Sequence, residues 1–245
     1  MAQKTLIFRG ESFAISYEFV NFDLSKTLIF LHGWGSNKAL MRGAFKDCFK
    51  EYRHLYIDMP GFGNSALPPF GLTSKDYQEI LSLFLQTLQI EPFAIFGHSF
   101  GGKIATLLNP KKLILLSSAG ILLPKPFCTT SKIRISKIFK HFPYFHNIIK
   151  VFLRSKDVAG MEEVMYQTFK NVVDEDFSEI FANFANEAWI FWGEDDRVTP
   201  LYAGEKIHSL IKNSSFFILK GDHYFCLTQV RQIESTLLEF FKRIE

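Results

Sequence analysis

Short apolar runs bounded by turn residues alternate along most of the chain with stretches whose apolar residues recur every three or four positions. This alternation is expected for an α/β protein with a mostly parallel sheet and crossover helices. The first two runs have no helical stretch between them, so we expect them to form an antiparallel pair at one edge of the sheet. The predicted strands are Thr5–Phe8, Phe13–Phe19, Thr27–Leu31, His54–Asp58, Phe93–Phe96, Lys112–Leu116, Ala188–Trp192 and Ser215–Leu219.

Three intervening stretches have the spacing of amphipathic helices. Thr73, three residues before Asp76, predicts a capping box at the start of the first helix. Thr199 as N-cap and Pro200 as first helical residue predict the start of the second. The apolar positions are 77, 80, 81, 84, 85 and 88 in the first helix, 203, 207, 210 and 211 in the second, and 233, 237, 241 and 244 in the last.

One region, from Leu122 to about Asn186, breaks this alternation because it has helical patterns and no convincing strand. A helical insertion of this length in an alternating fold indicates a cap over the ends of the strands. No linker, repeat or low-complexity tract divides the chain. We therefore expect one domain, residues 1–245, with an inserted helical cap at residues 122–186.

The clearest chemical motif is Gly97-His98-Ser99-Phe100-Gly101, which lies between a predicted strand and a short helical stretch. A G-x-S-x-G sequence in that context is typical of a nucleophile elbow, where a sharp turn exposes the serine hydroxyl. The turn crowds the backbone, so small residues are needed on both sides of the serine. The motif predicts Ser99 as a nucleophile.

A serine hydroxyl needs a neighbouring base, and that base needs a third group to fix its tautomer. His223 follows the last predicted strand and is the expected base. The loop after the preceding strand offers Glu194, Asp195 and Asp196, and the spacing alone leaves the choice of acid open. Asp222 is excluded because side chains of adjacent residues rarely point at each other productively.

An oxyanion hole needs two backbone N–H donors aimed at the developing negative charge. The segment His32-Gly33-Trp34-Gly35 directly follows the third predicted strand. In this arrangement the donors are the N–H groups of Trp34 and Phe100. The side chains of Trp34, Phe100 and Phe225 are expected to line the substrate pocket, and His32 to be a structural hydrogen-bonding residue.

With these motifs the chain resembles the α/β-hydrolase superfamily over essentially its whole length. The segment from Asp58 to Ser65 is similar to the family's D-x-P-G-x-G-x-S turn, whose role is mainly structural. The resemblance also implies the acid, because the family commonly has it third after the glycine of a W-G-x-x-D loop, which selects Asp196. It implies an α/β-hydrolase fold: an eight-stranded, mostly parallel sheet flanked by helices, with an inserted cap.

Within the superfamily, HGWG and DMPGFGNS are similar to esterases that cleave the pimeloyl-carrier-protein methyl ester. The overall pattern also resembles hydrolases of 2-hydroxy-6-oxo-dienoates. His98 stands where the former usually have Trp and the latter Asn. The resemblance implies a serine hydrolase that cleaves an ester or thioester of a small or medium acyl group. Carbon–carbon bond hydrolysis and a non-catalytic binding protein on the same fold are the alternatives.

Composition and charge limit the classes of partner, location and cofactor to be expected. The formal net charge of +3 is too small to indicate a nucleic-acid partner, and the 28 Phe supply a large core. The N-terminal segment lacks the apolar stretch of a signal peptide, and no run reaches the about 18 apolar residues of a membrane span. Cys48, Cys128 and Cys226 are odd in number and far apart, which favours a reducing cytoplasm over disulfides or a metal site. No metal or cofactor is expected.

The segment from Pro124 to Lys156 is basic and contains no Asp or Glu. One interpretation is a solvated face of the cap. The other is a docking surface for an acidic carrier protein, an anionic substrate or an anionic lipid surface. Its cations are Lys125, Lys132, Arg134, Lys137, Lys140, Lys150, Arg154 and Lys156.

Overall fold

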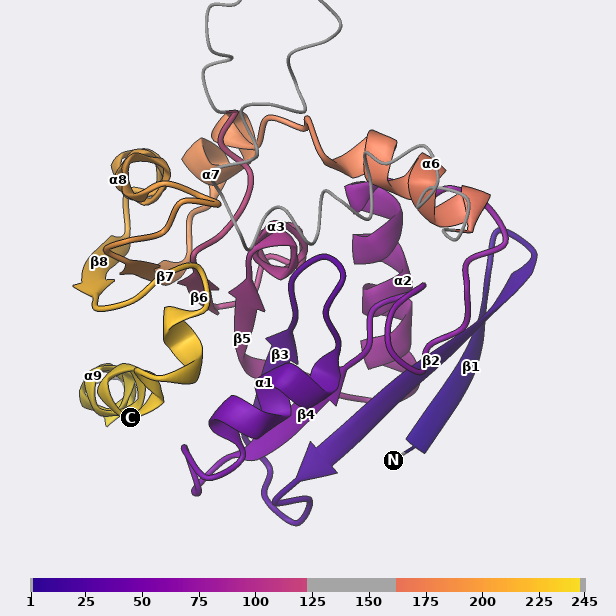
Figure 1. Ribbon diagram of the computed structural model, residues 1–245. Coiled ribbons are helices and arrows are strands. Elements are labelled where there is room, and N and C mark those ends of the chain that lie inside the picture. Colours follow the sequence, from indigo (N-terminus) through magenta and orange to yellow (C-terminus); the bar gives the residue numbers. More distant parts are fainter. Residues whose placement is uncertain (1, 123–161, 243–245) are drawn as a thin grey trace, which may run out of the picture.

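The computed structural model describes residues 2–122 and 162–242, and an eight-stranded sheet forms the centre of this part (Figure 1). The strand order is β1-β2-β4-β3-β5-β6-β7-β8. As predicted, β1 and β2 pair antiparallel at one edge; β2 is also antiparallel to β4, and the other neighbours are parallel. The strands are β1 (Ala2–Phe8), β2 (Glu11–Val20), β3 (Thr27–Leu31), β4 (Arg53–Ile57), β5 (Pro92–His98), β6 (Lys112–Leu116), β7 (Glu187–Gly193) and β8 (Ser214–Leu219).

The predicted helices are present, with one boundary corrected. The capping box of α2 forms between Thr73 and Asp76 as predicted. The prediction of Thr199 as an N-cap is wrong: α8 begins at Leu201 with Pro200 at the cap, and the Thr199 hydroxyl instead hydrogen-bonds to Asp196. The helices are α1 (Lys38–Phe45), α2 (Ser74–Thr87), α3 (Phe100–Leu107), α6 (Glu163–Val172), α7 (Ser178–Asn183), α8 (Leu201–Leu210), α9 (Val230–Lys242) and the 3₁₀ helix η3 (Phe225–Leu227).

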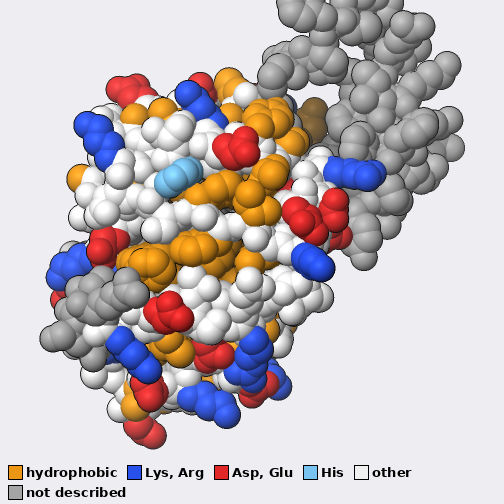
Figure 2. Space-filling model, turned by 90° about the vertical axis from the view of Figure 1, so that its left-hand side faces the viewer, with side chains coloured by type: hydrophobic (Ala, Val, Ile, Leu, Met, Phe, Trp, Pro, Cys, Tyr) orange, Lys and Arg blue, Asp and Glu red, His pale blue; other side chains and the backbone are white. Residues whose placement is uncertain are grey.

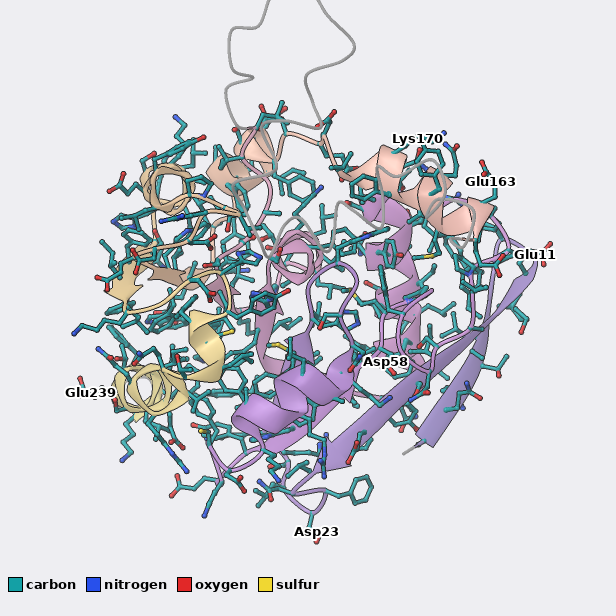
Figure 3. The ribbon with its side chains drawn as sticks, viewed as in Figure 1. Glu11, Asp23, Asp58, Glu163, Lys170 and Glu239 are labelled. Carbon is teal, nitrogen blue, oxygen red and sulfur yellow. The ribbon has the colours of Figure 1, made fainter. Side chains whose placement is uncertain are left out.

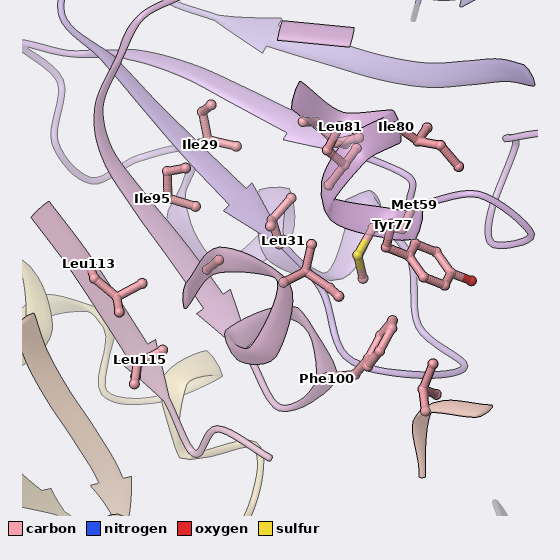
Figure 4. Close-up of a cluster of buried hydrophobic side chains, with 14 of the residues drawn as sticks. Ile29, Leu31, Met59, Tyr77, Ile80, Leu81, Ile95, Phe100, Leu113 and Leu115 are labelled. Carbon is pink, nitrogen blue, oxygen red and sulfur yellow. The ribbon is translucent and has the colours of Figure 1, made fainter. Parts of the chain in front are cut away.

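Two hydrophobic clusters cover the two faces of the sheet, and β3 contributes to both. Ile29 and Leu31 pack in the cluster that includes residues of α2, α3 and α8, whereas Leu28 and Phe30 pack against α1 and α9. Successive side chains of a strand point to opposite faces, so a strand covered on both sides is apolar throughout. Figure 4 shows part of the first cluster, including Ile29, Leu31 and Phe100.

The edge formed by β8 lies between α8 and α9. Figure 2 shows this side of the molecule, where hydrophobic side chains run across the surface between charged ones. Ile218 is 49% exposed there.

None of the helices in the described ranges combines the length and the apolar character that crossing a bilayer requires.

Only Leu122 and residues 162–186 of the expected cap belong to the described chain. They contain α6 and α7, and Figure 1 shows α6 lying across one end of α2. Thr168 and Asn171 of α6 hydrogen-bond to the backbone of Leu72, which is two residues before the start of α2. The basic segment from Pro124 to Lys156 lies outside the described residues, so the cap and its charge stay predictions.

Candidate active site

Ser99 occupies the turn between β5 and α3 in a strained backbone conformation. Its φ is 52° and its ψ is −117°, a region that residues with a side chain rarely adopt. Neighbouring backbone holds it there: Ser99 N–H donates to Leu116 O over 3.1 Å, and Ser99 O accepts from Gly102 and Ala119 N–H, both over 3.0 Å. The turn is therefore clamped to β6 and to the loop that follows it.

The two glycines of the motif are required by close backbone packing. A Cβ atom at Gly97 would lie 2.5 Å from Gly101 O. At Gly101 it would lie 2.6 Å from the carbonyl oxygens of both Leu31 and His32. Either substitution would push α3 away from the sheet, which explains the spacing of the motif.

Asp196 and His223 meet in the loops that follow β7 and β8. His223 Nδ1 lies 2.8 Å from Asp196 Oδ2, and the Asp196 side chain is completely buried. Asp196 Oδ1 also accepts from the N–H groups of Val198 and Thr199, over 2.8 and 2.9 Å. Burial opposes ionisation of this carboxyl group, but these hydrogen bonds outweigh burial, so the pKa of Asp196 is lowered.

The other acidic residues of this region lie elsewhere. Glu194 and Asp195 are exposed, and the Asp222 carboxylate accepts from Tyr224 N–H over 2.8 Å. Of the three acids that the spacing left open, Asp196 is the one bonded to His223 in the described chain.

Thr199 belongs to this site although the sequence predicted only a capping role for it. Its Oγ1 lies 3.0 Å from Asp196 Oδ2, 3.2 Å from Ser117 O and 3.2 Å from His223 Nδ1. The hydroxyl thus helps to hold both the carboxylate and the imidazole. Its distance of three residues from Asp196, in an Asp-x-x-Thr loop, is the signal that would have found it.

His98 connects the His223 loop to the nucleophile turn. Its Nε2 lies 2.9 Å from the carbonyl oxygen of His223, and the two imidazole rings are 4.8 Å apart. His98 directly precedes Ser99, so this hydrogen bond ties the His223 loop to the end of β5, and residues 99, 196 and 223 all follow the carboxyl ends of strands, those of β5, β7 and β8.

The loop expected to supply an oxyanion donor runs beside Ser99. A Cβ atom at Gly33 would lie 3.2 Å from Ser99 Cβ. His32 is fully buried, donates from Nδ1 to Gly33 O over 2.8 Å and accepts from Met59 N–H at Nε2 over 3.1 Å. Burial lowers the pKa of His32 to about 4, so this ring is neutral and fixes the loop.

The expected pocket residues separate into two groups. The Trp34 ring packs against Phe100 at 5.4 Å, Phe62 at 4.9 Å and Phe169 of α6 at 5.4 Å. Phe100 is the first residue of α3, so its N–H has no partner within the helix. Phe225, in contrast, is 1% exposed and packs in the cluster on the other face of the sheet, which makes it a core residue.

Asp58 is a buried carboxylate that stabilises the loops around the site. Figure 3 shows Asp58 in the interior, whereas Glu11, Asp23 and Glu239 lie at the periphery. Its carboxylate accepts from Lys38 Nζ over 2.5 Å, and both side chains are almost completely buried. The same carboxylate accepts from Asn64 N–H over 2.9 Å. The D-x-P-G-x-G-x-S turn is thus bound to the start of α1, and Lys38 is a partner that the sequence analysis missed.

Comparisons with known proteins agree with this architecture. A family model described as the alpha/beta hydrolase fold matches residues 26–120. The uncharacterized hydrolase YugF of Bacillus subtilis is 26% identical over 232 residues, which cover 79% of this chain and 81% of that protein. The 2-hydroxy-6-oxononadienedioate/2-hydroxy-6-oxononatrienedioate hydrolase of Paraburkholderia phymatum is 25% identical over 249 residues, covering 88% of this chain and 86% of that protein.

Solved structures show the same fold. A thermophilic esterase from Thermogutta terrifontis superposes with a TM-score of 0.76 at 14% identity, covering 100% of this chain and 99% of the esterase. The sheet order, the matching family model and this structure show that the chain has the α/β-hydrolase fold, and the hydrolase relatives support its place in the α/β-hydrolase superfamily.

Proposed function

We propose that this protein is a serine hydrolase that cleaves a carboxylic ester or thioester through an acyl-enzyme. Ser99 is the nucleophile, His223 the general base and Asp196 the residue that orients it. The observation that carries the proposal is the buried hydrogen bond between Asp196 and His223, since the same histidine is tied through its carbonyl group to the residue before Ser99.

The contacts of His223 define its role in the reaction. Asp196 accepts a hydrogen bond from Nδ1–H, so Nε2 keeps a lone pair and accepts the hydroxyl proton as Ser99 Oγ attacks the substrate carbonyl. The tetrahedral oxyanion is held by the N–H groups of Phe100 and Trp34, each worth about 3 kcal/mol. His223 then protonates the leaving alcohol or thiol, and a water molecule releases the acid from Ser99 by the same steps.

The aromatic side chains beside Ser99 support an apolar acyl group of small or medium size. Trp34 is half-buried and contacts both Phe100, next to the nucleophile, and Phe169 of α6. A site lined by aromatic rings favours alkyl or aryl chains over charged ones.

A second candidate reaction is hydrolysis of a carbon–carbon bond in a 2-hydroxy-6-oxo-dienoate. The observation in its favour is the Paraburkholderia relative, which is similar along 88% of this chain. Such a reaction would use the same three residues but would begin with ketonisation of the dienol. Comparing rates on p-nitrophenyl butyrate and on a ring-fission dienoate distinguishes the two, and turnover of the dienoate alone would exclude the ester proposal.

The basic segment from Pro124 to Lys156 supports an acidic partner such as a carrier protein or an anionic surface. Replacing Lys132, Arg134 and Lys137 by Glu is expected to weaken binding of an acidic carrier protein, with a larger loss at low salt. Unchanged affinity would leave this segment as a solvated face.

Ser99→Ala tests the proposal as a whole. We expect it to lower kcat on p-nitrophenyl butyrate by at least about 10³-fold, because the nucleophile is removed while the fold is kept. A fluorophosphonate should label the parent protein at Ser99 and leave the variant unlabelled. Turnover by Ser99→Ala within about tenfold of the parent would rule out the mechanism.

A further inference from the structure

His98 is a buried histidine beside the proposed catalytic residues, and the mechanism above gives it no task. It is the last residue of β5, is 1% exposed and directly precedes Ser99. Three parts of the site meet at this ring: the nucleophile turn through the chain itself, the His223 loop through a hydrogen bond, and the oxyanion loop through Gly33.

The hydrogen bond fixes the tautomer of His98. A carbonyl oxygen can only accept, so the contact of 2.9 Å between His98 Nε2 and His223 O requires the proton on Nε2. Nδ1 then carries a lone pair, and it has no hydrogen-bond partner among the described residues. It faces Gly33, where a Cβ atom would lie 3.1 Å away.

The ring is also electrically neutral. Burial lowers the pKa of His98 to about 3, and the nearby His223 acts in the same direction. A neutral ring only 4.8 Å from the His223 imidazole does not oppose the positive charge that His223 gains when it takes the serine proton.

We propose that His98 is a positioning residue: its Nε2–H holds the His223 carbonyl and thereby sets the placement of the His223 imidazole relative to Ser99. The proposal rests on the function proposed above and assigns a specific task to the residue between Gly97 and Ser99. The donor and the nucleophile are adjacent in the chain, so one rigid strand end determines the position of both the base and the hydroxyl.

Two substitutions of similar size separate the hydrogen bond from the packing. In His98→Gln the side-chain amide keeps an N–H donor near the position of Nε2, whereas His98→Met fills similar space without a donor. We expect His98→Met to lower kcat on p-nitrophenyl butyrate about 30-fold with KM changed by less than about threefold, since misplacement by a fraction of an ångström affects chemistry more than binding. His98→Gln should stay within about threefold of the parent in kcat.

A spectroscopic measurement reports the positioning directly. The proton between His223 Nδ1 and Asp196 Oδ2 should give a low-field proton resonance in the parent protein and in His98→Gln. In His98→Met this resonance should be broadened or lost, because the imidazole is no longer fixed against the carboxylate.

His54 provides the matched control for general destabilisation. It is also a fully buried histidine whose Nε2 lies 3.1 Å from a backbone carbonyl, that of Phe49. It lies near the start of β4, level with Ala94 of β5 rather than with the end of that strand, and packs against Phe30. His54→Met should lower the melting temperature and leave kcat within about twofold of the parent.

Two results would overturn the inference: an unchanged kcat and low-field resonance in His98→Met, or equal losses in His98→Met and His98→Gln. Either result, with Ser99→Ala and His223→Ala still inactive, refutes the role of His98 and leaves the proposed function intact. If Ser99→Ala and His223→Ala keep full turnover, the proposed function fails and the role of His98 fails with it.

Discussion

At the scale of single residues, the site depends on buried polar groups whose hydrogen bonds hold them in place. Asp196 receives hydrogen bonds at both carboxylate oxygens, and His32 uses both ring nitrogens. A buried polar group left without its partner costs about 1–3 kcal/mol, so such residues hold a single geometry. Here that geometry includes the orientation of His223.

Substitutions of Asp196 and of Thr199, whose hydroxyl contacts its carboxylate, should lower kcat to different degrees. Asp196→Asn is expected to lower kcat about 10⁴-fold, because an amide no longer enforces the tautomer of His223 that leaves Nε2 free. Thr199→Val keeps the shape but removes the hydroxyl at 3.0 Å from Asp196 Oδ2, and should lower kcat about tenfold. Steady-state kinetics on p-nitrophenyl butyrate measure both effects. A Thr199→Val loss as large as that of Asp196→Asn would show that the hydroxyl acts on substrate.

At the scale of elements, a buried lysine connects α3 to α6 and the loop that follows α6. Lys103 of α3 donates from Nζ to Val172 O over 2.7 Å and to Glu175 Oε2 over 2.6 Å. Val172 is the last residue of α6, where a cation also interacts favourably with the helix dipole. Glu175 in turn accepts from Ser74 Oγ at the start of α2. The four groups join α2, α3 and α6 above the sheet.

Lys103→Met tests this connection. The substitution leaves Val172 O and Glu175 without their cation, and we expect it to lower the free energy of unfolding by about 2 kcal/mol, less than for a fully buried pair because Glu175 is partly exposed. Lys111 and Glu91 form the control, since their side chains are 79% and 81% exposed. Lys111→Met should change stability by less than about 0.5 kcal/mol in urea unfolding. Equal effects of the two substitutions would contradict the structural role of Lys103.

At the scale of the whole molecule, local sequence patterns predicted the sheet well because each strand is defined by its own residues. All eight strands were predicted, Thr27–Leu31 and Lys112–Leu116 with their observed bounds. The helix α1 was not predicted, since it has only eight residues and includes Gly43, a poor helix former. Short helices of this kind are stabilised by tertiary packing, here through Met41 and Phe45.

The residues that the sequence did not reveal act through contacts between distant segments. The pairing of Lys38 with Asp58 and of Lys103 with Glu175 spans 20 and 72 residues, and no local periodicity records either. Phe225 was expected in the pocket, but it begins a 3₁₀ turn and packs in the cluster on the other face of the sheet. Motif spacing predicts which residues carry chemistry, whereas the fold determines which side chains support them.

The buried histidines predict how the stability of the whole protein depends on pH. Burial lowers the pKa of His32 to about 4 and of His98 to about 3, both below the ordinary value of 6.5. Between pH 6.5 and pH 4 the unfolded chain therefore binds protons that the native protein does not bind. The free energy of unfolding falls as the pH is lowered. Each ring should cost about 1.5 kcal/mol between pH 6.5 and pH 5. Urea unfolding should show this loss, and His98→Gln should reduce its slope by about one proton; an unchanged slope would mean that His98 is already charged in the native protein.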